Sequence, residues 1–171
     1  MATYILNKKS VINFNLDRNL YNVLVRVTSP GVEFPRLKDE GIYRDILELQ
    51  FFDFEDDRSG LYIFNETILK RILDFFEKHR NCKNMVIHCE SGISRSAGIA
   101  VGWFLFNDTT SSIYRLYHDD KHLPNRLIVY HFYKRFGRDL GQINKWEKDR
   151  LKRLMSKKWP EKKTPRLDGD P

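Results

Sequence analysis

The sequence predicts a single α/β domain with a central, mostly parallel, twisted sheet flanked by helices. Two apolar segments of strand length, 45–53 and 83–89, enclose a segment with helical periodicity at 65–80. This order is typical of a βαβ unit, whose two strands are parallel. The length of 171 residues suits one domain with a full core, and the hydrophobic content of 41% excludes a disordered composition.

Two segments in the first third of the chain have the pattern of strands. 'NVLVRVTSPG' (22–31) is rich in valine and ends in a Ser-Pro-Gly turn. 'DILELQFFD' (45–53) alternates and then becomes continuously apolar, so we predict a strand that ends at Asp53. The polar segment 'FEDDRSG' (54–60) follows and is predicted to be a loop.

The rest of the chain is predicted to be helical, apart from one buried strand. Asn65 can cap a helix over 65–80, where apolar residues recur at helical spacing. 'KNMVIHC' (83–89) has the composition of a short buried strand. 'SAGIAVGWFLF' (96–106) is apolar on all sides, which is typical of a buried helix. Further helices are predicted near 111–119, 127–136 and 143–158.

The net charge of +7 is concentrated in the C-terminal part of the chain. Between positions 142 and 171, ten Lys and Arg residues stand against five Asp and Glu residues. A solvated helix followed by a flexible end explains this surplus, and a weak acidic partner such as nucleic acid, an anionic membrane or an acidic protein is the alternative. We therefore predict a domain over 1–158 and a basic, flexible tail over 159–171.

The sequence also predicts a compartment. No run of roughly 18 apolar residues indicates a membrane span, and the N-terminus lacks the apolar centre of a signal peptide. With two cysteines and no export signal, we predict a cytoplasmic protein whose thiols are free. A strand separates Cys82 from Cys89, which places them too far apart for a disulfide.

The segment 'HCESGISRS' (88–96) joins the buried strand to the buried helix. In a twisted α/β sheet, ligands bind beyond the carboxyl ends of the strands, so this loop is the expected binding site. Gly92 permits a positive φ, and the loop N–H groups can then form a nest for an anion. Arg95 can grip two oxygens of a phosphate. The same N–H groups stabilise a thiolate at Cys89, which can attack a bound phosphorus.

The pattern His-Cys-x5-Arg-Ser in 'HCESGISRS' resembles the signature loop of the cysteine-dependent protein tyrosine phosphatases. Its 'GISRS' ending is most similar to the dual-specificity branch. The strand 'LELQFFD', the helix 'FNETILKRILDFF' and the loop also follow in the order of that family, and 'LPNRLIVYHF' is similar to its Pro-Asn pair before a helix (Pro124, Asn125). The resemblance extends roughly from Asp45 to Gly137, whereas the first forty residues and the basic tail resemble no segment of the family.

The resemblance implies a phosphatase that needs neither a metal nor another cofactor. Cys89 would be the nucleophile and Arg95 the phosphate clamp, and Ser96 would assist hydrolysis of the cysteinyl-phosphate. His88 would be structural, holding the loop and tuning the thiolate. The substrate phosphate would be bound by the backbone amides of the loop, contributed by Glu90, Ser91, Gly92, Ile93, Ser94 and Arg95.

A carboxyl group is also needed, because the leaving oxygen must gain a proton and the attacking water must lose one. Asp53 follows the apolar strand directly, where the family places its acid. Asp57 lies closer to the spacing before the cysteine that is customary in the branch. Asp53 is the preferred general acid and Asp57 the alternative.

The substrate implied by the resemblance is a phosphorylated protein. The short chain has little room for the pocket-deepening loop of tyrosine-specific members, so phosphotyrosine and also phosphoserine or phosphothreonine are expected. The variable loop side chains include no Lys, Arg or His, which disfavours phosphoinositides and RNA triphosphates; these side chains are Glu90, Ser91, Ile93 and Ser94. An RNA 5′-phosphatase anchored by the basic tail, and a catalytically idle phosphate-binding module, remain the alternatives.

A metal site is not predicted. His118 and His122 stand four positions apart beside two aspartates, a spacing that can suggest metal ligands. Pro124 follows closely, and no third ligand occurs at a suggestive spacing.

Overall fold

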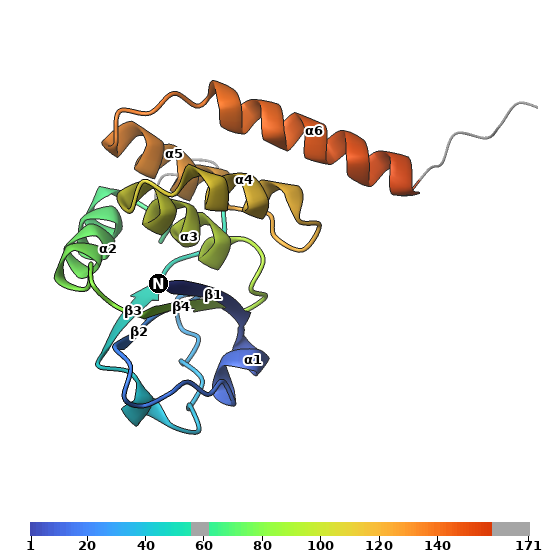
Figure 1. Cartoon of the computed structure of the whole chain (residues 1–171). Helices are drawn as coiled ribbons and strands as arrows, with labels where there is room; N and C mark the ends of the chain where they lie inside the picture. The colour runs from blue at the N-terminus through green and yellow to red at the C-terminus, as the bar shows by residue number, and fades with distance from the viewer. Residues whose placement is uncertain (56–61, 159–171) are drawn as a thin grey trace, which may run out of the picture.

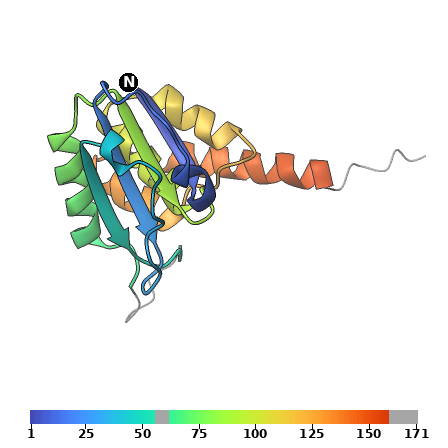
Figure 2. The same cartoon turned by 90° about the horizontal axis from the view of Figure 1, so that it is seen from below.

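The computed structural model describes residues 1–55 and 62–158 and confirms the predicted α/β class. Its sheet has four strands in the order β1-β4-β2-β3, and each neighbouring pair is parallel. Figure 2 shows the strands side by side, with β1 at one edge and β3 at the other. The strands are β1 (Ala2–Asn7), β2 (Asn22–Thr28), β3 (Asp45–Gln50) and β4 (Asn84–Cys89).

Helices cover both faces of the sheet unequally (Figure 1). The larger layer packs on one face and contains α2 (Glu66–Lys78), α3 (Arg95–Phe106), α4 (Thr110–His118), α5 (Arg126–Arg135) and α6 (Gly141–Lys158). The opposite face carries α1 (Lys8–Ile12) and the connection that contains the 3-10 helix η1 (Glu40–Ile42). The strands β2 and β4 are buried along their whole length, because they lie in the middle of the sheet between two apolar clusters.

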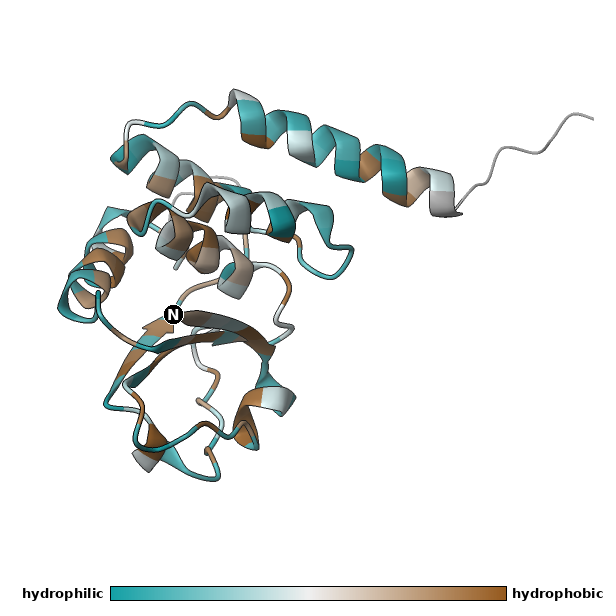
Figure 3. Ribbon diagram, viewed as in Figure 1, coloured by the Kyte–Doolittle hydropathy of each residue, from teal (hydrophilic) through white to brown (hydrophobic). Residues whose placement is uncertain are grey.

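Helix α3 is the central element of the larger layer, and its burial follows from its composition. Residues 95–103 are all buried, as the apolar sequence predicts. The approach of α5 requires a glycine, because a Cβ atom at Gly102 would lie 2.4 Å from the ring of Phe132. In Figure 3 the brown α3 contrasts with the mostly teal α6, which lies on the outside. Trp146 of α6 packs against this core and contacts the rings of Tyr114 and Tyr117, as a helix anchor would.

Two features of the sheet differ from the prediction. The strand β3 ends at Gln50 rather than at Asp53. Phe51 N makes the last bond to β2, at Thr28 O (3.1 Å), and Phe52 N donates instead to the carbonyl of Tyr62 at 2.7 Å. The edge strand β1 was not predicted at all, and it pairs with β4 from Ala2–Asn84 to Asn7–Cys89. Thr3, Tyr4 and Ile5 favour a strand, but the segment is short and only half-buried, and its pairing with β4 stabilises it.

Candidate active site

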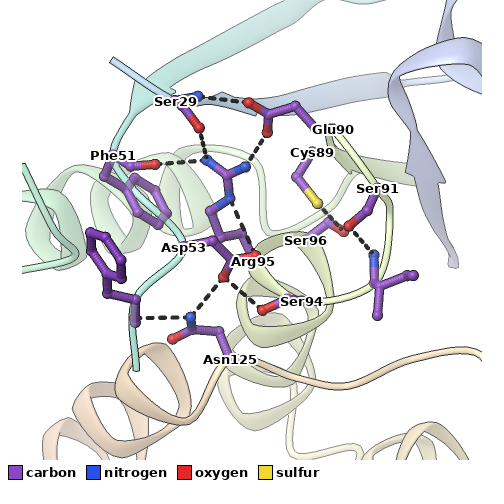
Figure 4. Close-up of polar contacts among 12 residues, drawn as sticks. Ser29, Phe51, Asp53, Cys89, Glu90, Ser91, Ser94, Arg95, Ser96 and Asn125 are labelled. Atoms are coloured by element: carbon purple, nitrogen blue, oxygen red, sulfur yellow. Dashed lines mark hydrogen bonds and ion pairs between the residues drawn. The ribbon is translucent and has the colours of Figure 1, made fainter. Parts of the chain in front are cut away.

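The parallel strands β2, β3 and β4 have their carboxyl ends on the same side of the sheet, and the candidate site lies beyond these ends (Figure 4). Cys89 ends β4 and is fully buried, and Arg95 begins α3. Ser29 follows β2, and Phe51 follows β3. Three strand ends and one helix start therefore place their side chains around the signature loop, which we define as residues 88–96.

The signature loop is tightly wound, as the glycine at position 92 predicts. Gly92 has φ +69°, a conformation that other residues rarely adopt, and a Cβ atom here would lie 2.6 Å from the backbone N of Asn7. The unpredicted strand β1 therefore supports the loop from outside. Lys8 N also donates to the carbonyl of Glu90 at 3.1 Å, which ties the start of α1 to the same loop.

The thiol of Cys89 lies within hydrogen-bond distance of the side chain of Ser96. Ser96 Oγ lies 3.2 Å from Cys89 Sγ, and both residues are fully buried. The serine occupies the first turn of α3, so the hydroxyl approaches the sulfur from the helix N-terminus. A hydroxyl at this distance can donate a hydrogen bond to a thiolate.

Arg95 is almost entirely buried, with 5% of its side chain exposed, and several segments hold it. Its Nη1 donates to the carbonyl oxygen of Phe51 at 2.7 Å and to Ser29 Oγ at 3.3 Å. Its Nη2 donates to the carboxylate of Glu90. Asp53 Oδ2 lies 3.8 Å from Nε, which has no hydrogen-bond partner among the described residues. The guanidinium is thus fixed at the edge of the loop.

Asp53, the preferred acid, lies at this site. Its Oδ1 accepts hydrogen bonds from Ser94 Oγ at 2.7 Å and from Asn125 Nδ2 at 2.8 Å. One third of its side chain is exposed, so the carboxyl group can reach both solvent and the loop. The alternative acid, Asp57, lies outside the described residues, and its assignment stays a prediction.

Asn125 links three parts of the site, and its side chain was not among the predicted site residues. Its Oδ1 accepts from Ile128 N at 3.1 Å and caps α5, while its Nδ2 also donates to the carbonyl of Phe54 at 3.1 Å. Its backbone N donates to the carbonyl of Ser94 at 3.2 Å. The Pro-Asn pair before a helix was the available sequence signal. Its physical role is to hold the Asp53 loop against the signature loop.

His88 is fully buried under the loop, on the face of the sheet opposite Cys89. Neither ring nitrogen has a side-chain hydrogen-bond partner among the described residues. Burial lowers the pKa of His88 to about 4, and the nearby charge of Arg26 contributes to the decrease. The ring is therefore neutral at neutral pH.

We expect His88 to make the stability of the protein depend on pH. The unfolded histidine titrates near 6.5 and the folded one at about 4, so the unfolded state binds the extra proton between these values. The free energy of unfolding is therefore unaffected by the titration of His88 above pH ~6.5. It decreases by on the order of 3 kcal/mol as the pH falls to about 4. Urea unfolding at pH 7 and pH 4.5 measures this decrease in the free energy of unfolding. The decrease should be smaller in His88→Leu and unchanged in His118→Gln. Equal decreases in all three proteins would contradict the assignment.

The two histidines with the spacing of metal ligands, His118 and His122, have other neighbours in the structure. His118 stacks on Tyr114 with ring centroids 3.8 Å apart, and Nδ1 of His122 lies 2.6 Å from a carboxylate oxygen of Asp119. Over 1–55 and 62–158, no group of three or more His, Cys, Asp or Glu side chains is placed to hold a metal ion. Within the same ranges, no helix has the length and apolarity to cross a membrane. The predicted tail, 159–171, lies outside the described residues.

Comparisons with known proteins find the likeness in structure rather than in sequence. No family model and no curated protein matches the chain. The solved structure of human tyrosine phosphatase-like serine/threonine/tyrosine-interacting protein superposes with a TM-score of 0.52 at 14% identity, over 79% of this chain and 91% of the other. Human DUSP28 superposes with a TM-score of 0.52 at 14% identity, over 88% and 94%. The chain therefore has the fold of the dual-specificity phosphatases, the branch that its signature loop resembles.

Proposed function

We propose that this protein hydrolyses phosphomonoesters on proteins, phosphotyrosine and also phosphoserine or phosphothreonine, through a cysteinyl-phosphate. The observation that carries the proposal is the meeting of Cys89, Ser96, Arg95 and Asp53 around one tightly wound loop. These are a nucleophile, a donor to its sulfur, a phosphate clamp and a carboxyl group. Arg95 and Ser96 form the N-terminus of α3, whose dipole favours an anion.

In the first step, the thiolate of Cys89 attacks phosphorus, so the S–P bond forms and the bond to the leaving oxygen breaks. Asp53, protonated beforehand, gives its proton to that oxygen. Arg95 and the loop N–H groups stabilise the charge on the three other phosphate oxygens.

In the second step, water attacks phosphorus and the S–P bond breaks. Asp53, now ionised, accepts the proton of the water and is ready for the next cycle. Ser96 Oγ donates to the sulfur and stabilises the departing thiolate, which the separation of 3.2 Å permits. Phosphate leaves, and the protein returns to its starting state.

The charge of the site favours a simple monoester. Glu90 pairs with Arg95 and offsets its charge, so a polyanion would meet a carboxylate beside the phosphate clamp. This arrangement disfavours RNA triphosphates. One structural neighbour is named phosphatase-like, so an idle phosphate-binding module is the second alternative.

The test is hydrolysis of para-nitrophenyl phosphate with EDTA present. We expect turnover that EDTA does not reduce and that a phosphotyrosine peptide inhibits by competition. Phosphate binding without turnover would leave the idle module. Competition by RNA 5′-triphosphate, with none by the phosphopeptide, would instead favour the RNA-directed enzyme. In that case, removal of residues 159–171 should also flatten the salt dependence of RNA binding.

We expect Asp53→Asn to lower kcat by about 10²-fold or more on a phosphotyrosine peptide, with little change in ground-state affinity. The loss should be smaller on para-nitrophenyl phosphate, because its leaving group needs a proton less. Glu55→Gln is the matched control, since Glu55 is also an acid of this segment but accepts a hydrogen bond from Arg126 N, at 3.4 Å, rather than from the signature loop. A larger loss in Asp57→Asn than in Asp53→Asn would move the acid to position 57.

A further inference from the structure

The side chain of Glu90 has a part in the site beyond the backbone amide that the sequence predicts. Its Oε1 accepts a hydrogen bond from Ser29 N at 2.8 Å, and its Oε2 accepts from Arg95 Nη2. It therefore connects the residue after β2 with the first residue of α3 (Figure 4). Burial alone would raise the pKa of Glu90, but the bond from Ser29 N and the charge of Arg95 outweigh it and lower the pKa.

The hydrogen bonds of Arg95 leave donors on one edge of its guanidinium unused. An arginine has five N–H donors in a planar fork. Both donors of Nη1 have acceptors, at Phe51 and Ser29, and Glu90 accepts from Nη2. The buried Nε–H has no hydrogen-bond partner among the described residues, although Asp53 Oδ2 lies 3.8 Å away, and Nη2 carries a second donor. These two nitrogens form an edge that can bind two phosphate oxygens, provided that the guanidinium is held in this orientation.

A carboxylate of this length suits the position of Glu90 because both of its oxygens accept. Glutamine has one carbonyl oxygen, so its amide nitrogen would face one of the two donors, Ser29 N or Arg95 Nη2. Aspartate keeps the charge, but it is one methylene shorter and cannot reach both donors from the same backbone. The contacts therefore depend on the charge and on the length of the side chain together.

We propose that Glu90 is a positioning residue: it ties the guanidinium of Arg95 to the end of β2, so that the Nε and Nη2 edge faces the phosphate. The inference rests on the proposed phosphate site and adds the residue that orients its clamp. It also gives Ser29 a defined role, since its backbone N anchors Glu90 and its hydroxyl contacts Nη1.

Calorimetric titration with inorganic phosphate tests the proposal directly, together with KM and kcat on para-nitrophenyl phosphate. We expect Glu90→Gln and Glu90→Asp each to weaken phosphate binding and raise KM by about tenfold, because each loses a hydrogen bond to a charged group. The decrease in kcat should be smaller than the increase in KM. Glu77→Gln is the control: it removes one exposed carboxylate on α2 that pairs with Arg80 just beyond the helix, and it should behave as the unchanged protein.

The aspartate variant separates geometry from charge. If only the negative field of Glu90 mattered, Glu90→Asp would match the unchanged protein, and the proposal would be wrong. Tighter phosphate binding in Glu90→Gln would also overturn it, because Glu90 would then compete with phosphate for Arg95. A thermal unfolding midpoint close to that of the unchanged protein ensures that each variant is folded, and the aspartate variant serves if glutamine prevents folding.

The failure of this inference and that of the proposed function can be told apart. If the unchanged protein binds phosphate and turns over substrate while both Glu90 variants equal it, only the positioning role fails. If the unchanged protein binds phosphate without turnover, the hydrolase proposal fails. The phosphate affinities of the Glu90 variants still test the positioning role in that case. If it neither binds nor turns over, both proposals fail.

Discussion

Replacement of Cys89 by serine is expected to abolish turnover and to leave phosphate binding intact. A serine hydroxyl is not ionised at neutral pH and is a poor nucleophile without a base, so we expect kcat to fall by on the order of 10⁴-fold or more. Binding should persist, because Arg95 and the loop N–H groups are unchanged. The measurements are kcat on para-nitrophenyl phosphate and calorimetric titration with inorganic phosphate.

Cys82→Ser is the matched control for this prediction. Cys82 is buried between α2 and β4, and burial raises its pKa to about 11, so it carries no thiolate at neutral pH. Its replacement should leave kcat unchanged. Both cysteines are free. Equal losses in the two variants would indicate a shared folding defect, and turnover that survives in Cys89→Ser would exclude the proposed nucleophile.

The second large effect is expected at Arg95. Arg95→Ala should lose both phosphate binding and turnover, with kcat/KM lower by about 10³- to 10⁵-fold, the range for an arginine that stabilises a transferring phosphoryl group. It also leaves the half-buried carboxylate of Glu90 without its cation. Arg95→Lys should restore little, because an ammonium group is a point charge and cannot present two parallel donors.

The control for Arg95 is an arginine that lies near the site and is not part of it. Arg126 begins α5, has 62% of its side chain exposed and pairs with Glu147 at 3.2 Å. Its replacement by alanine should change kcat/KM by no more than about threefold, since exposed ion pairs contribute ~1 kcal/mol or less. If Arg95→Lys kept most of the activity, the proposal that Arg95 binds two phosphate oxygens would be wrong.

The sequence predicted the elements whose signals are local. The helix capped by Asn65, the buried strand before Cys89 and the apolar helix after it all occur, because their periodicity and composition are strong. The tight loop with a positive φ at Gly92 was predicted for the same reason. Local patterns therefore placed the signature loop between its strand and its helix.

The features that the sequence did not predict depend on contacts between distant segments. The strand β1 is short, lies at an edge of the sheet and is stabilised by its pairing with β4. Asn125 and Ser29 reach the site through the folded arrangement of α5 and β2, and Glu90 acquires its side-chain role only because Ser29 N lies opposite. No periodicity in a sequence reports such meetings of strand ends and helix starts.

The most direct test of the central claim is to trap the phosphoenzyme. The protein is mixed with a ³²P-labelled phosphotyrosine peptide and quenched within milliseconds, and the labelled residue is identified by mass spectrometry. We expect label on Cys89, more of it in Ser96→Ala, where departure of the thiolate is slowed, and none in Cys89→Ser. Steady turnover with no label on Cys89 at any quench time would contradict the account.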